Sequence, residues 1–337
     1  MSVMERARRA RRCGRGWGGS SYRWHGILFG SRSADGKLLL SVATNIRRPS
    51  LHKMAASHPG APTVEDRAML SELVVATYNK PTYLSLALDA LTRQTTLPSS
   101  VCIADDGSDE RTSNVIEGFR ARNPHITVRH VWHEDLGFRK NQILNQAVAS
   151  STADYLVFID DDCLMHPTFI GRHLALASSD SFLTGSVIRL DKSLSEQLIE
   201  QGSVNWNSKG RPPSWEPKTM SERLKSMPLG PSIMGILDRL SPIRCSWAGG
   251  NASTFRSSIY LVNGFDTRMA YGGEDKEFGA RLTNAGVVGR HIRYSAPLYH
   301  LEHGRGYVDP EMVAANRVII RDTRTSKRFV TEHGLVR

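Results

Sequence analysis

Three apolar segments, each followed at once by polar residues, constrain the fold of this chain more than any other feature. Residues 73–77, 100–104 and 155–159 have the length and composition of buried strands. Segments with helical spacing separate them, which favours a largely parallel sheet with right-handed crossovers. We therefore predict an α/β fold with a mostly parallel sheet and flanking helices.

Other elements follow the same alternation. Helices are expected at residues 82–94, 113–122, 140–149 and 276–283, and a further strand at 127–131. A short strand is also predicted near residues 37–42.

The polar residues that follow the strands are predicted to meet. Thr77 and Asn79 follow the first strand, residues 105–108 (Asp-Asp-Gly-Ser) follow the second, and residues 160–162 (Asp-Asp-Asp) follow the third. Ligands of open parallel sheets bind outside the carboxyl ends of the strands. The three clusters should therefore face one crevice.

The Asp run at Asp160, Asp161 and Asp162 indicates a metal site. Adjacent carboxylates repel one another unless cations or strong donors neutralise them. Hard oxygen ligands at a strand end suit Mg²⁺ or Mn²⁺ bridging a diphosphate. The alternative is a helix start, where Asp caps the first turn. The position beside two other polar strand ends favours the metal, with a sugar nucleotide as its partner.

A second acidic cluster lies at Gly272-Gly273-Glu274-Asp275. Two glycines allow the backbone to approach a ligand closely. One carboxylate of the pair could take the proton of an acceptor hydroxyl during a sugar transfer. The alternative is an acidic helix N-terminus without a catalytic role.

Two further groups of residues are candidates for the same site. His300 and His303 stand three residues apart, and neutral imidazoles could complete a Mn²⁺ site begun by the Asp run. Arg139 and Lys140 open the helix that contains Asn145, and could meet a diphosphate there. The alternatives are a structural histidine pair and a solvated basic face.

Residues 191–244 break the alternation with several prolines and two tryptophans in a polar context. We expect an irregular excursion with helices at 221–227 and 233–240. Trp206 and Trp215 could stack on sugar rings or pack into a local cluster, and the sequence leaves both open.

The basic charge is concentrated near the N-terminus. Residues 1–68 contain 13 Lys/Arg and four Asp/Glu, so they carry +9 of the net +11, and the other 269 residues carry +2. A basic tail beside a nearly neutral body is weak evidence for nucleic-acid binding, and we expect no nucleic-acid partner. An attraction to anionic membranes stays open. Because Met69 directly precedes the first regular segment, one hypothesis is that residues 1–68 over-extend the coding start.

The cysteines and the apolar runs bear on localisation. The four cysteines have no paired spacing, which argues against a disulfide framework. No run approaches the ~18 apolar residues of a membrane-spanning helix, and the start lacks the apolar segment of a signal peptide. We expect a cytoplasmic protein that is soluble or peripheral at the inner face of the membrane.

Together these residues resemble the family 2 glycosyltransferases, which have the Rossmann-like GT-A fold. The resemblance covers residues 73–307, and residues 75–79 (Val-Ala-Thr-Tyr-Asn) are similar to the family's opening strand and nucleotide loop. It implies that Asp106 contacts the nucleoside. It also implies that Asp160 lies near the ribose and Asp162 on the metal.

Residues 137–147 resemble the branch typified by the amino-terminal half of chondroitin polymerase. This resemblance implies donor contacts for Arg139 and Asn145. That branch often has Arg where this chain has Leu144, and Arg139 and Lys140 are candidates to replace it.

Residues 262–266 and 272–275 resemble the carboxyl-terminal module of the β-1,4-galactosyltransferases. The resemblance implies that Asp275 is the catalytic base and that Glu274 and Gly273 position the sugars. Tyr271 stands where that module usually has Trp. The same resemblance implies that His303 is the first choice of metal ligand and His300 the second. Gly250 and Asp161 complete the residues expected to bind the sugar nucleotide.

The combined resemblance implies an inverting, Mn²⁺- or Mg²⁺-dependent transfer of a hexose or N-acetylhexosamine. The donor would be a UDP-sugar, and the acceptor a saccharide or a lipid-linked saccharide, in cell-surface polysaccharide synthesis. Two alternatives are an inactive homologue that binds nucleotide sugar or carbohydrate, and a sugar-1-phosphate nucleotidyltransferase. The latter needs a Gly-rich basic loop after the first strand, which residues 77–81 lack.

Five parts are expected along the chain. They are a basic tail (1–68), a nucleotide-sugar-binding half (69–190), the acceptor-region excursion (191–244), a galactosyltransferase-like module (245–308) and a C-terminal helix and tail (309–337).

Overall fold

A computed structural model describes residues 31–32, 38–39, 68–227, 229–304 and 309–335. The chain divides into two units, Met1–Thr63 and Val64–Arg337. In the first unit only β1 (Ser31–Arg32) and β2 (Leu38–Leu39) are described, and they pair antiparallel. The strand predicted near 37–42 overlaps β2, and the rest of that prediction lies outside the described residues.

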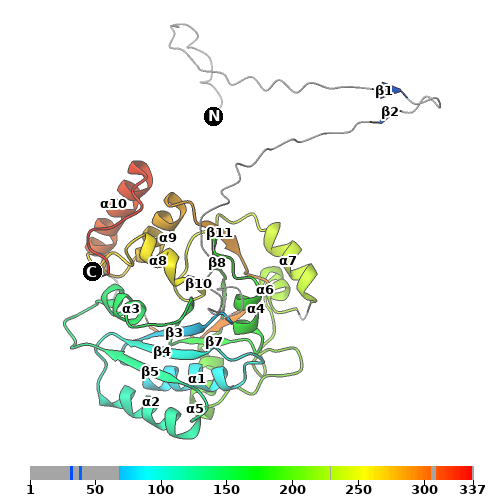
Figure 1. Ribbon diagram of the computed structural model, residues 1–337. Helices are drawn as coiled ribbons and strands as arrows, with labels where there is room; N and C mark the ends of the chain where they lie inside the picture. The colour runs from blue at the N-terminus through cyan, green and yellow to red at the C-terminus, as the bar shows by residue number, and fades with distance from the viewer. Residues whose placement is uncertain (1–30, 33–37, 40–67, 228, 305–308, 336–337) are drawn as a thin grey trace, which may run out of the picture. The chain divides into compact units, whose positions relative to one another are not determined.

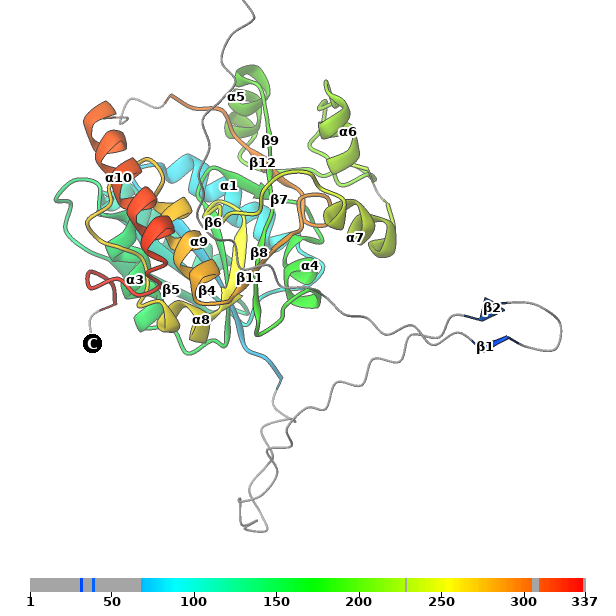
Figure 2. The ribbon, with the colours of Figure 1, turned by 90° about the horizontal axis from the view of Figure 1, so that it is seen from above.

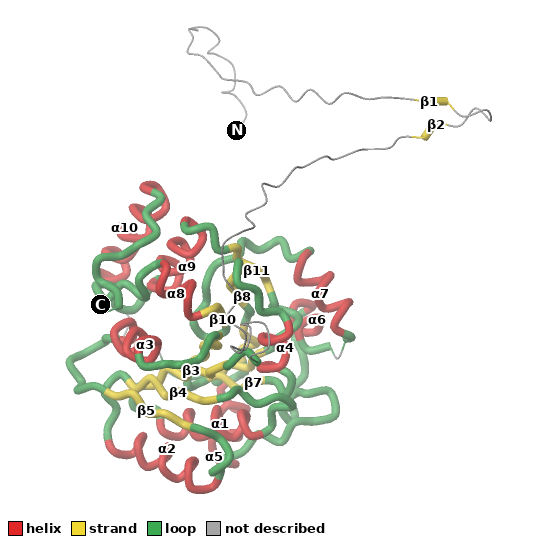
Figure 3. The backbone as a smooth tube through the Cα atoms, viewed as in Figure 1, coloured by secondary structure: helices red, strands yellow, loops and turns green. Residues whose placement is uncertain are grey.

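The second unit is built on a seven-stranded sheet (Figures 1 and 3). Its order is β11 (Val288–His291), β8 (Ser181–Thr184), β10 (Ala252–Phe255), β6 (Tyr155–Asp160), β3 (Ser71–Thr77), β4 (Ser100–Asp105) and β5 (Val128–Trp132). Strand β10 runs antiparallel to both of its neighbours, and the other four pairs are parallel. The predicted mostly parallel sheet is therefore confirmed.

Helices cover both faces of this sheet, as Figure 3 shows for the red segments above and below the yellow strands. The expected helices are present as α1 (Pro81–Thr92), α2 (Glu110–Arg122), α3 (Lys140–Ala149) and α9 (Glu274–Asn284). The others are α4 (Phe169–Ala175), α5 (Lys192–Gln201), α6 (Met220–Lys225), α7 (Pro231–Arg239), α8 (Arg256–Leu261) and α10 (Pro310–Ser326).

Alternate residues of the central strands pack into two separate cores. Leu73 and Val75 of β3 belong to the core under α1 and α2, whereas Val74 and Ala76 belong to the core under α3, α8 and α9. Side chains of a strand point alternately to opposite faces. Burial of both faces explains why these strands read as continuous apolar runs.

A second, three-stranded sheet was not predicted. It has the order β7 (Cys163–Met165), β12 (Leu298–His300) and β9 (Val187–Arg189). Strands of three residues carry too little pattern to be read from sequence. In this sheet His300 pairs directly with Cys163, which brings the end of β12 beside the Asp run.

The excursion at residues 191–244 contains more helix than predicted. Helices α6 and α7 match the two expected there, and α5 is additional. Asp191 caps α5 through the backbone N–H of Leu194, and Thr219 with Glu222 forms a capping box on α6. Among the described residues, no helix has both the length and the apolar character needed to span a bilayer.

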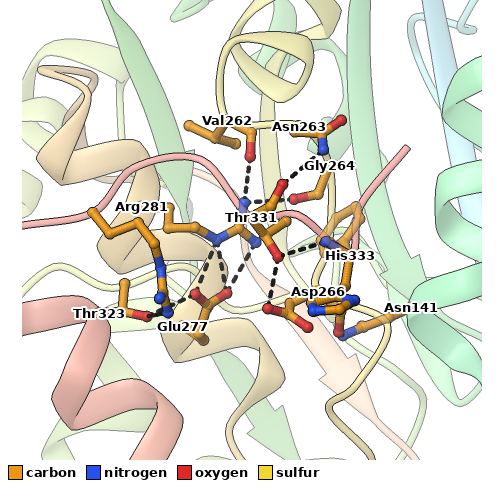
Figure 4. Close-up of polar contacts among 12 residues, drawn as sticks. Asn141, Val262, Asn263, Gly264, Asp266, Glu277, Arg281, Thr323, Thr331 and His333 are labelled. Atoms are coloured by element: carbon orange, nitrogen blue, oxygen red, sulfur yellow. Dashed lines mark hydrogen bonds and ion pairs between the residues drawn. The ribbon is translucent and has the colours of Figure 1, made fainter. Parts of the chain in front are cut away.

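A buried ion pair joins α9 to the loop before it and to α10 (Figure 4). Arg281 is fully buried, and its Nε lies 2.9 Å from both carboxylate oxygens of Glu277. Its Nη1 donates to the carbonyls of Val262 (2.6 Å) and Gly264 (2.7 Å). Thr323 of α10 donates to the same Glu277 carboxylate at 2.9 Å.

Replacing Arg281 should destabilise the fold strongly. Arg281→Met leaves the Glu277 carboxylate and two carbonyls buried without their donor, which costs ~3–5 kcal/mol for a broken buried pair. Chemical denaturation measures the free energy of unfolding. The control is Lys192→Met, which removes an exposed pair with Glu196 and should cost at most ~1 kcal/mol. Equal losses in the two variants would contradict this role of Arg281.

Candidate functional site

The polar residues at the strand ends meet, as predicted. The Thr77 hydroxyl donates to Asp161 Oδ2 at 2.8 Å, and the Asp161 N–H donates to the Ala76 carbonyl at 2.9 Å. The Asp106 N–H donates to the Thr77 carbonyl at 3.0 Å. The ends of β3, β4 and β6 thus form one continuous polar edge.

A cavity of about 290 Å³ opens at this edge. Six predicted site residues line it: Thr77, Asp106, Asp160, Asp161, Asp162 and Glu274. Its other side chains include Tyr78, Lys80, Phe138, Lys140 and Tyr271. The rings of Phe138 and Tyr271 meet edge to face, with their centroids 6.0 Å apart. The cavity lining therefore combines an aromatic pair with the acidic side chains.

Asp162, His300 and His303 form a cluster that could hold a metal ion. Their ligand atoms all lie within 4.8 Å of one another. His303 Nε2 lies 2.7 Å from Asp162 Oδ2, and His300 Nε2 lies 3.5 Å from Asp162 Oδ1. His303 Nδ1 contacts the Gly304 carbonyl at 2.8 Å, which turns Nε2 toward Asp162.

The protonation states of Asp162 and His300 suit a divalent cation, whereas His303 must release a proton before it can bind one. Burial opposes ionisation of Asp162, but the hydrogen bond from His303 and the Lys80 charge hold the pKa of Asp162 well below its usual range. Burial lowers the pKa of His300, which keeps that imidazole neutral. The hydrogen bond with Asp162 raises the pKa of His303. One carboxylate and two imidazoles are a donor set that Mn²⁺ accepts, so these residues fit the metal.

Lys80 lies in the middle of the cluster. Its Nζ is 3.1 Å from Asp162 Oδ2, 3.2 Å from His303 Nε2 and 3.8 Å from Asp161 Oδ1. Burial and the charge of Asp162 raise the pKa of Asp161 to about 7 even though Lys80 opposes the shift. Because Lys80 Nζ lies close to both Asp162 Oδ2 and His303 Nε2, its ammonium occupies the space between these two candidate metal ligands.

The second acidic cluster is held by backbone amides. Glu274 Oε2 accepts the N–H groups of Gly272 and Gly273, each at 2.9 Å. Both glycines have left-handed φ values, 115° and 111°, so a side chain would be strained at either position. Asp275 Oδ2 accepts the Gly249 N–H at 2.9 Å. Burial and the charge of Glu274 raise the pKa of Asp275 to about 7.

Two consecutive glycines lie between the two acidic clusters. A Cβ on Gly250 would come within 2.9 Å of Asp160 Oδ2, and a Cβ on Gly249 within 2.7 Å of Asp275 Oδ1. Side chains here would push these carboxylates away. The absence of side chains at 249 and 250 therefore lets Asp160 and Asp275 approach the same short loop.

Lys140 joins the same two clusters electrostatically. Its Nζ lies 2.6 Å from Asp160 Oδ1. Although burial favours the neutral amine, the surrounding carboxylates raise the pKa of Lys140 well above its ordinary value. The carboxylates that raise the pKa of Lys140 are, in order of decreasing effect, Asp160, Asp275 and Glu274.

Asn79 and Arg139 shape the site through the backbone. Asn79 is tied to the loop after β4, since its N–H donates to Ser108 Oγ at 2.8 Å and its Oδ1 accepts the Asp109 N–H at 2.9 Å. The Arg139 N–H donates to Asp106 Oδ2 at 2.9 Å, while its guanidinium donates to the Glu134 carbonyl. Lys80 and Lys140 line the cavity, and Arg139 is not among its lining residues.

Asn145 has a structural position, away from the cavity wall. Its Nδ2 donates to the Phe265 carbonyl and its Oδ1 accepts the Phe265 N–H, both at 2.8 Å. Asn145, expected to contact the donor, is not among the residues that line the cavity. The side chain instead fastens α3 to the loop before α9.

The two tryptophans of the excursion pack into a local cluster. Trp206 and Trp215 both contact the ring of Tyr299, with centroids 5.7 and 5.3 Å apart. Trp215 is 5% exposed. The sequence left open whether the two tryptophans stack on sugar rings or pack into a local cluster, and the structure favours the local cluster.

Two family profiles match the chain. The profile described as "Glycosyl transferase family 2" matches residues 72–235, which contain the three strand-end clusters. The profile described as "N-terminal domain of galactosyltransferase" matches residues 244–304, which contain Glu274, Asp275 and both histidines. The chain carries a family 2 glycosyltransferase domain.

Curated relatives support this glycosyltransferase assignment. Validoxylamine A glucosyltransferase of Streptomyces hygroscopicus subsp. limoneus is 27% identical over 259 residues, 72% of this chain and 54% of that protein. Chondroitin synthase of Escherichia coli is 24% identical over 245 residues, 68% of this chain and 34% of that protein. The chain thus spans about half or less of the length of these two relatives.

A solved structure shares the fold. The crystal structure of GalNAc-T7 with UDP, GalNAc and Mn²⁺ matches 77% of this chain and 48% of that chain, with a TM-score of 0.53 and 14% sequence identity. At this identity the likeness shows the fold alone. The glycosyltransferase domain therefore has the GT-A fold that the sequence resemblance implied.

Sequence reasoning missed Lys80 and His133 of the candidate site, and it named Lys140 only as a possible contact of a diphosphate. Lys80 is the N-cap of α1 and Lys140 the first residue of α3, so both stand at helix starts that follow polar loops. That position was a usable signal, because helix N-termini gather at the ligand edge of such sheets. His133 Nε2 lies 2.8 Å from Asp106 Oδ1, and a lone histidine in a loop gives no such hint.

Asn145→Ala should destabilise the domain because it leaves the Phe265 N–H and carbonyl buried without partners. We expect a loss of ~2 kcal/mol in the free energy of unfolding. Chemical denaturation of the variant tests this. Asn114→Ala, an exposed change on α2, is the control and should stay within ~0.5 kcal/mol of wild type. An Asn145→Ala variant as stable as the control would contradict the structural role.

Proposed function

We propose that the chain is an inverting, metal-dependent glycosyltransferase. It moves a hexose or N-acetylhexosamine from a UDP-sugar to a saccharide or lipid-linked acceptor in cell-surface polysaccharide synthesis. The observation that carries the proposal is the approach of Asp160, which lines the cavity, and of Asp275 to the adjacent glycines Gly250 and Gly249. This arrangement combines a candidate metal and nucleotide edge with a candidate base.

Asp162 and His303 would hold the metal, with His300 as a third ligand. Their mutual distances and the ionised state of Asp162 support this assignment. The GT-A neighbour GalNAc-T7 was crystallised with UDP and Mn²⁺, which supports UDP and Mn²⁺ as ligands of this fold. A bound Mn²⁺ would supply charge neutralisation for the diphosphate leaving group.

The nucleotide would lie along the edge formed by Thr77, Asp106 and Asp160. These side chains line the cavity, and Asp106 is oriented by His133 and by the Arg139 N–H. Asp161 also lines the cavity, where its hydrogen bond to Thr77 fixes it. Because Lys140 bonds Asp160 at the cavity wall, its ammonium is in place to meet the negative charge of the donor.

Asp275 would be the base that takes the proton of the acceptor hydroxyl. Its pKa of about 7 suits proton abstraction near neutral pH. Glu274 is engaged by two backbone N–H groups, which supports a positioning role for it and Gly273. The acceptor would meet residues 191–244, and the relative named chondroitin synthase supports a polysaccharide product.

Transfer from a panel of UDP-sugars with Mn²⁺ tests the proposed function. Asp275→Asn should lower kcat ~10²–10⁴-fold because the base is lost. Asp162→Ala should lower activity ~10²-fold or more because a metal ligand is lost. Asp322→Asn, which changes an exposed carboxylate of α10, is the matched control and should retain full activity.

Two outcomes would contradict the proposal. Full activity in both Asp275→Asn and Asp162→Ala would remove the assigned roles. UDP binding by the wild type without turnover of any donor would instead favour a nucleotide-sugar-binding homologue.

The pH profile should depend on Lys140. Because Asp275 must be ionised to act as a base, kcat should rise with pH through about 7 and level off above it. Lys140→Met removes a cation that stabilises the Asp275 carboxylate, so the pKa of Asp275 rises and the acid limb moves to higher pH. Lys140→Arg keeps the charge and should keep the limb. A Lys140→Met profile that coincides with wild type would contradict this coupling.

Lys80 should compete with the metal for the same ligands. Its Nζ must leave Asp162 Oδ2 and His303 Nε2 before these atoms can bind Mn²⁺. Lys80→Met should therefore tighten Mn²⁺ binding ~10-fold or more, as measured by the loss of the free Mn²⁺ electron paramagnetic resonance signal. Equal or weaker Mn²⁺ affinity in Lys80→Met would contradict this competition.

A further inference from the structure

Helix α7 and its C-cap expose three large aliphatic side chains. Met234 and Asp238 are the buried residues of this helix. Ile233, Ile236 and Leu240 are 51%, 54% and 73% exposed, and their spacing of three and four residues places them on one stripe. Ile243, just beyond the helix, is 53% exposed. Half-exposed large aliphatic side chains on one stripe mark an interaction surface.

The orientation of α7 is fixed by its buried acid. Asp238 Oδ1 accepts the Tyr294 N–H at 2.8 Å, and Asp238 Oδ2 accepts the Ser295 hydroxyl. Rotating the helix to bury the isoleucines would remove both bonds and bring the carboxylate to the surface. The outward apolar stripe is therefore imposed by the fold.

The exposed charges between residues 218 and 244 are of one sign, and the exposed acid just before this range, Glu216, is paired with Arg211. Between residues 218 and 244 the exposed charged side chains are Lys218, Arg223, Arg239 and Arg244, all basic. The two acids of the segment are engaged, since Glu222 closes the α6 capping box and Asp238 is buried under α7. Lys218 is paired with Asp191, so three arginines define the charge of this surface.

Helices α6 and α7 lie together at one edge of the second unit. Figures 1 and 2 show them beyond α4 and β11, on the opposite side from α3 and α10. The His291 side chain of β11 contacts the Ile243 carbonyl at 2.6 Å, which fastens the end of this segment to the large sheet. The segment thus presents its apolar and basic groups on a fixed base.

We propose that this surface, defined by Ile233, Ile236, Leu240 and Ile243 with Arg239 and Arg244, docks on an anionic lipid bilayer. Aliphatic side chains would enter the boundary between headgroups and acyl chains, as in interfacial amphipathic helices. The arginines beside them would contact anionic headgroups. Docking of this kind goes beyond the transfer reaction and does not depend on it. It holds a segment of the proposed acceptor region at the membrane surface, where lipid-linked saccharides are found.

Sedimentation with vesicles tests the docking surface in the full-length protein. The vesicles contain phosphatidylcholine alone or with about a third phosphatidylglycerol. We expect binding to the anionic vesicles that persists at about 0.5 M NaCl, where screening suppresses the contribution of the basic residues 1–68. Ile233→Ser/Ile236→Ser/Leu240→Ser should lower the partition coefficient ~10-fold or more at this salt concentration.

Two further variants separate the contributions. Arg239→Gln/Arg244→Gln should lower binding to anionic vesicles ~10-fold at about 0.1 M NaCl while leaving residues 1–68 intact. Val318→Ser removes a comparably exposed side chain from α10 and should bind like wild type. Unchanged melting temperatures show that the variants are folded, because all the replaced side chains are exposed.

Three results would overturn the proposal. They are wild-type binding at high salt by the triple serine variant, no binding of the wild type to anionic vesicles, and a dimer in light scattering that the serine variant converts to a monomer. The last would assign the surface to a second copy of the chain. None of these measurements includes a UDP-sugar or a saccharide acceptor. Their outcome therefore does not affect the proposed glycosyl transfer, which the activity assays test.

Discussion

The concentration of carboxylates at the carboxyl edge of the sheet is the constraint on which the rest of the site depends. Asp106, Asp160, Asp161, Asp162 and Glu274 line one cavity of about 290 Å³, where water cannot screen them fully. Such a group is stable only with matching cations and N–H donors. Much of the surrounding architecture meets this requirement.

The two helices that follow the polar strand ends supply the cations. Lys80 stands at the start of α1 and lies against Asp161 and Asp162, and Lys140 stands at the start of α3 and bonds Asp160. Both helices also direct the positive ends of their dipoles to this edge. The βα connections thus place fixed positive charge beside each acid, in the region where a diphosphate would add two more negative charges.

The galactosyltransferase-like segment completes the site through close backbone contacts. Gly249 and Gly250 allow Asp275 and Asp160 to approach one loop, and the pairing of β12 with β7 brings His300 to Asp162. Asn145 fastens this segment to α3 through the Phe265 backbone. The two acidic clusters and the candidate metal ligands therefore come from segments more than a hundred residues apart, which only the folded chain brings together.

The sheet could be predicted from the sequence because β3, β4 and β6 are buried on both faces and end in polar residues. The approximate positions of Asp162, His303 and Asp275 followed from resemblance to known motifs. The positions of Lys80 and Lys140 at helix starts pointed to this edge, but their pairing with Asp162 and Asp160 could not be predicted, because a single lysine carries no mark of its partner. Asn145 was expected to contact the donor because of the family resemblance. Its bonds to Phe265 could not be predicted, because they link residues 120 positions apart.

In the proposed site the nucleotide and the metal lie side by side, and Asp275 is next to Asp160 across Gly249 and Gly250. A crystal structure of the protein with UDP and Mn²⁺, with anomalous data for the metal, tests this most directly. The account predicts an anomalous peak in bonding contact with Asp162 and His303, Lys80 moved away from both, and UDP along Thr77, Asp106 and Asp160. A Mn²⁺ ion bound away from Asp162, or UDP bound outside the cavity, would contradict it.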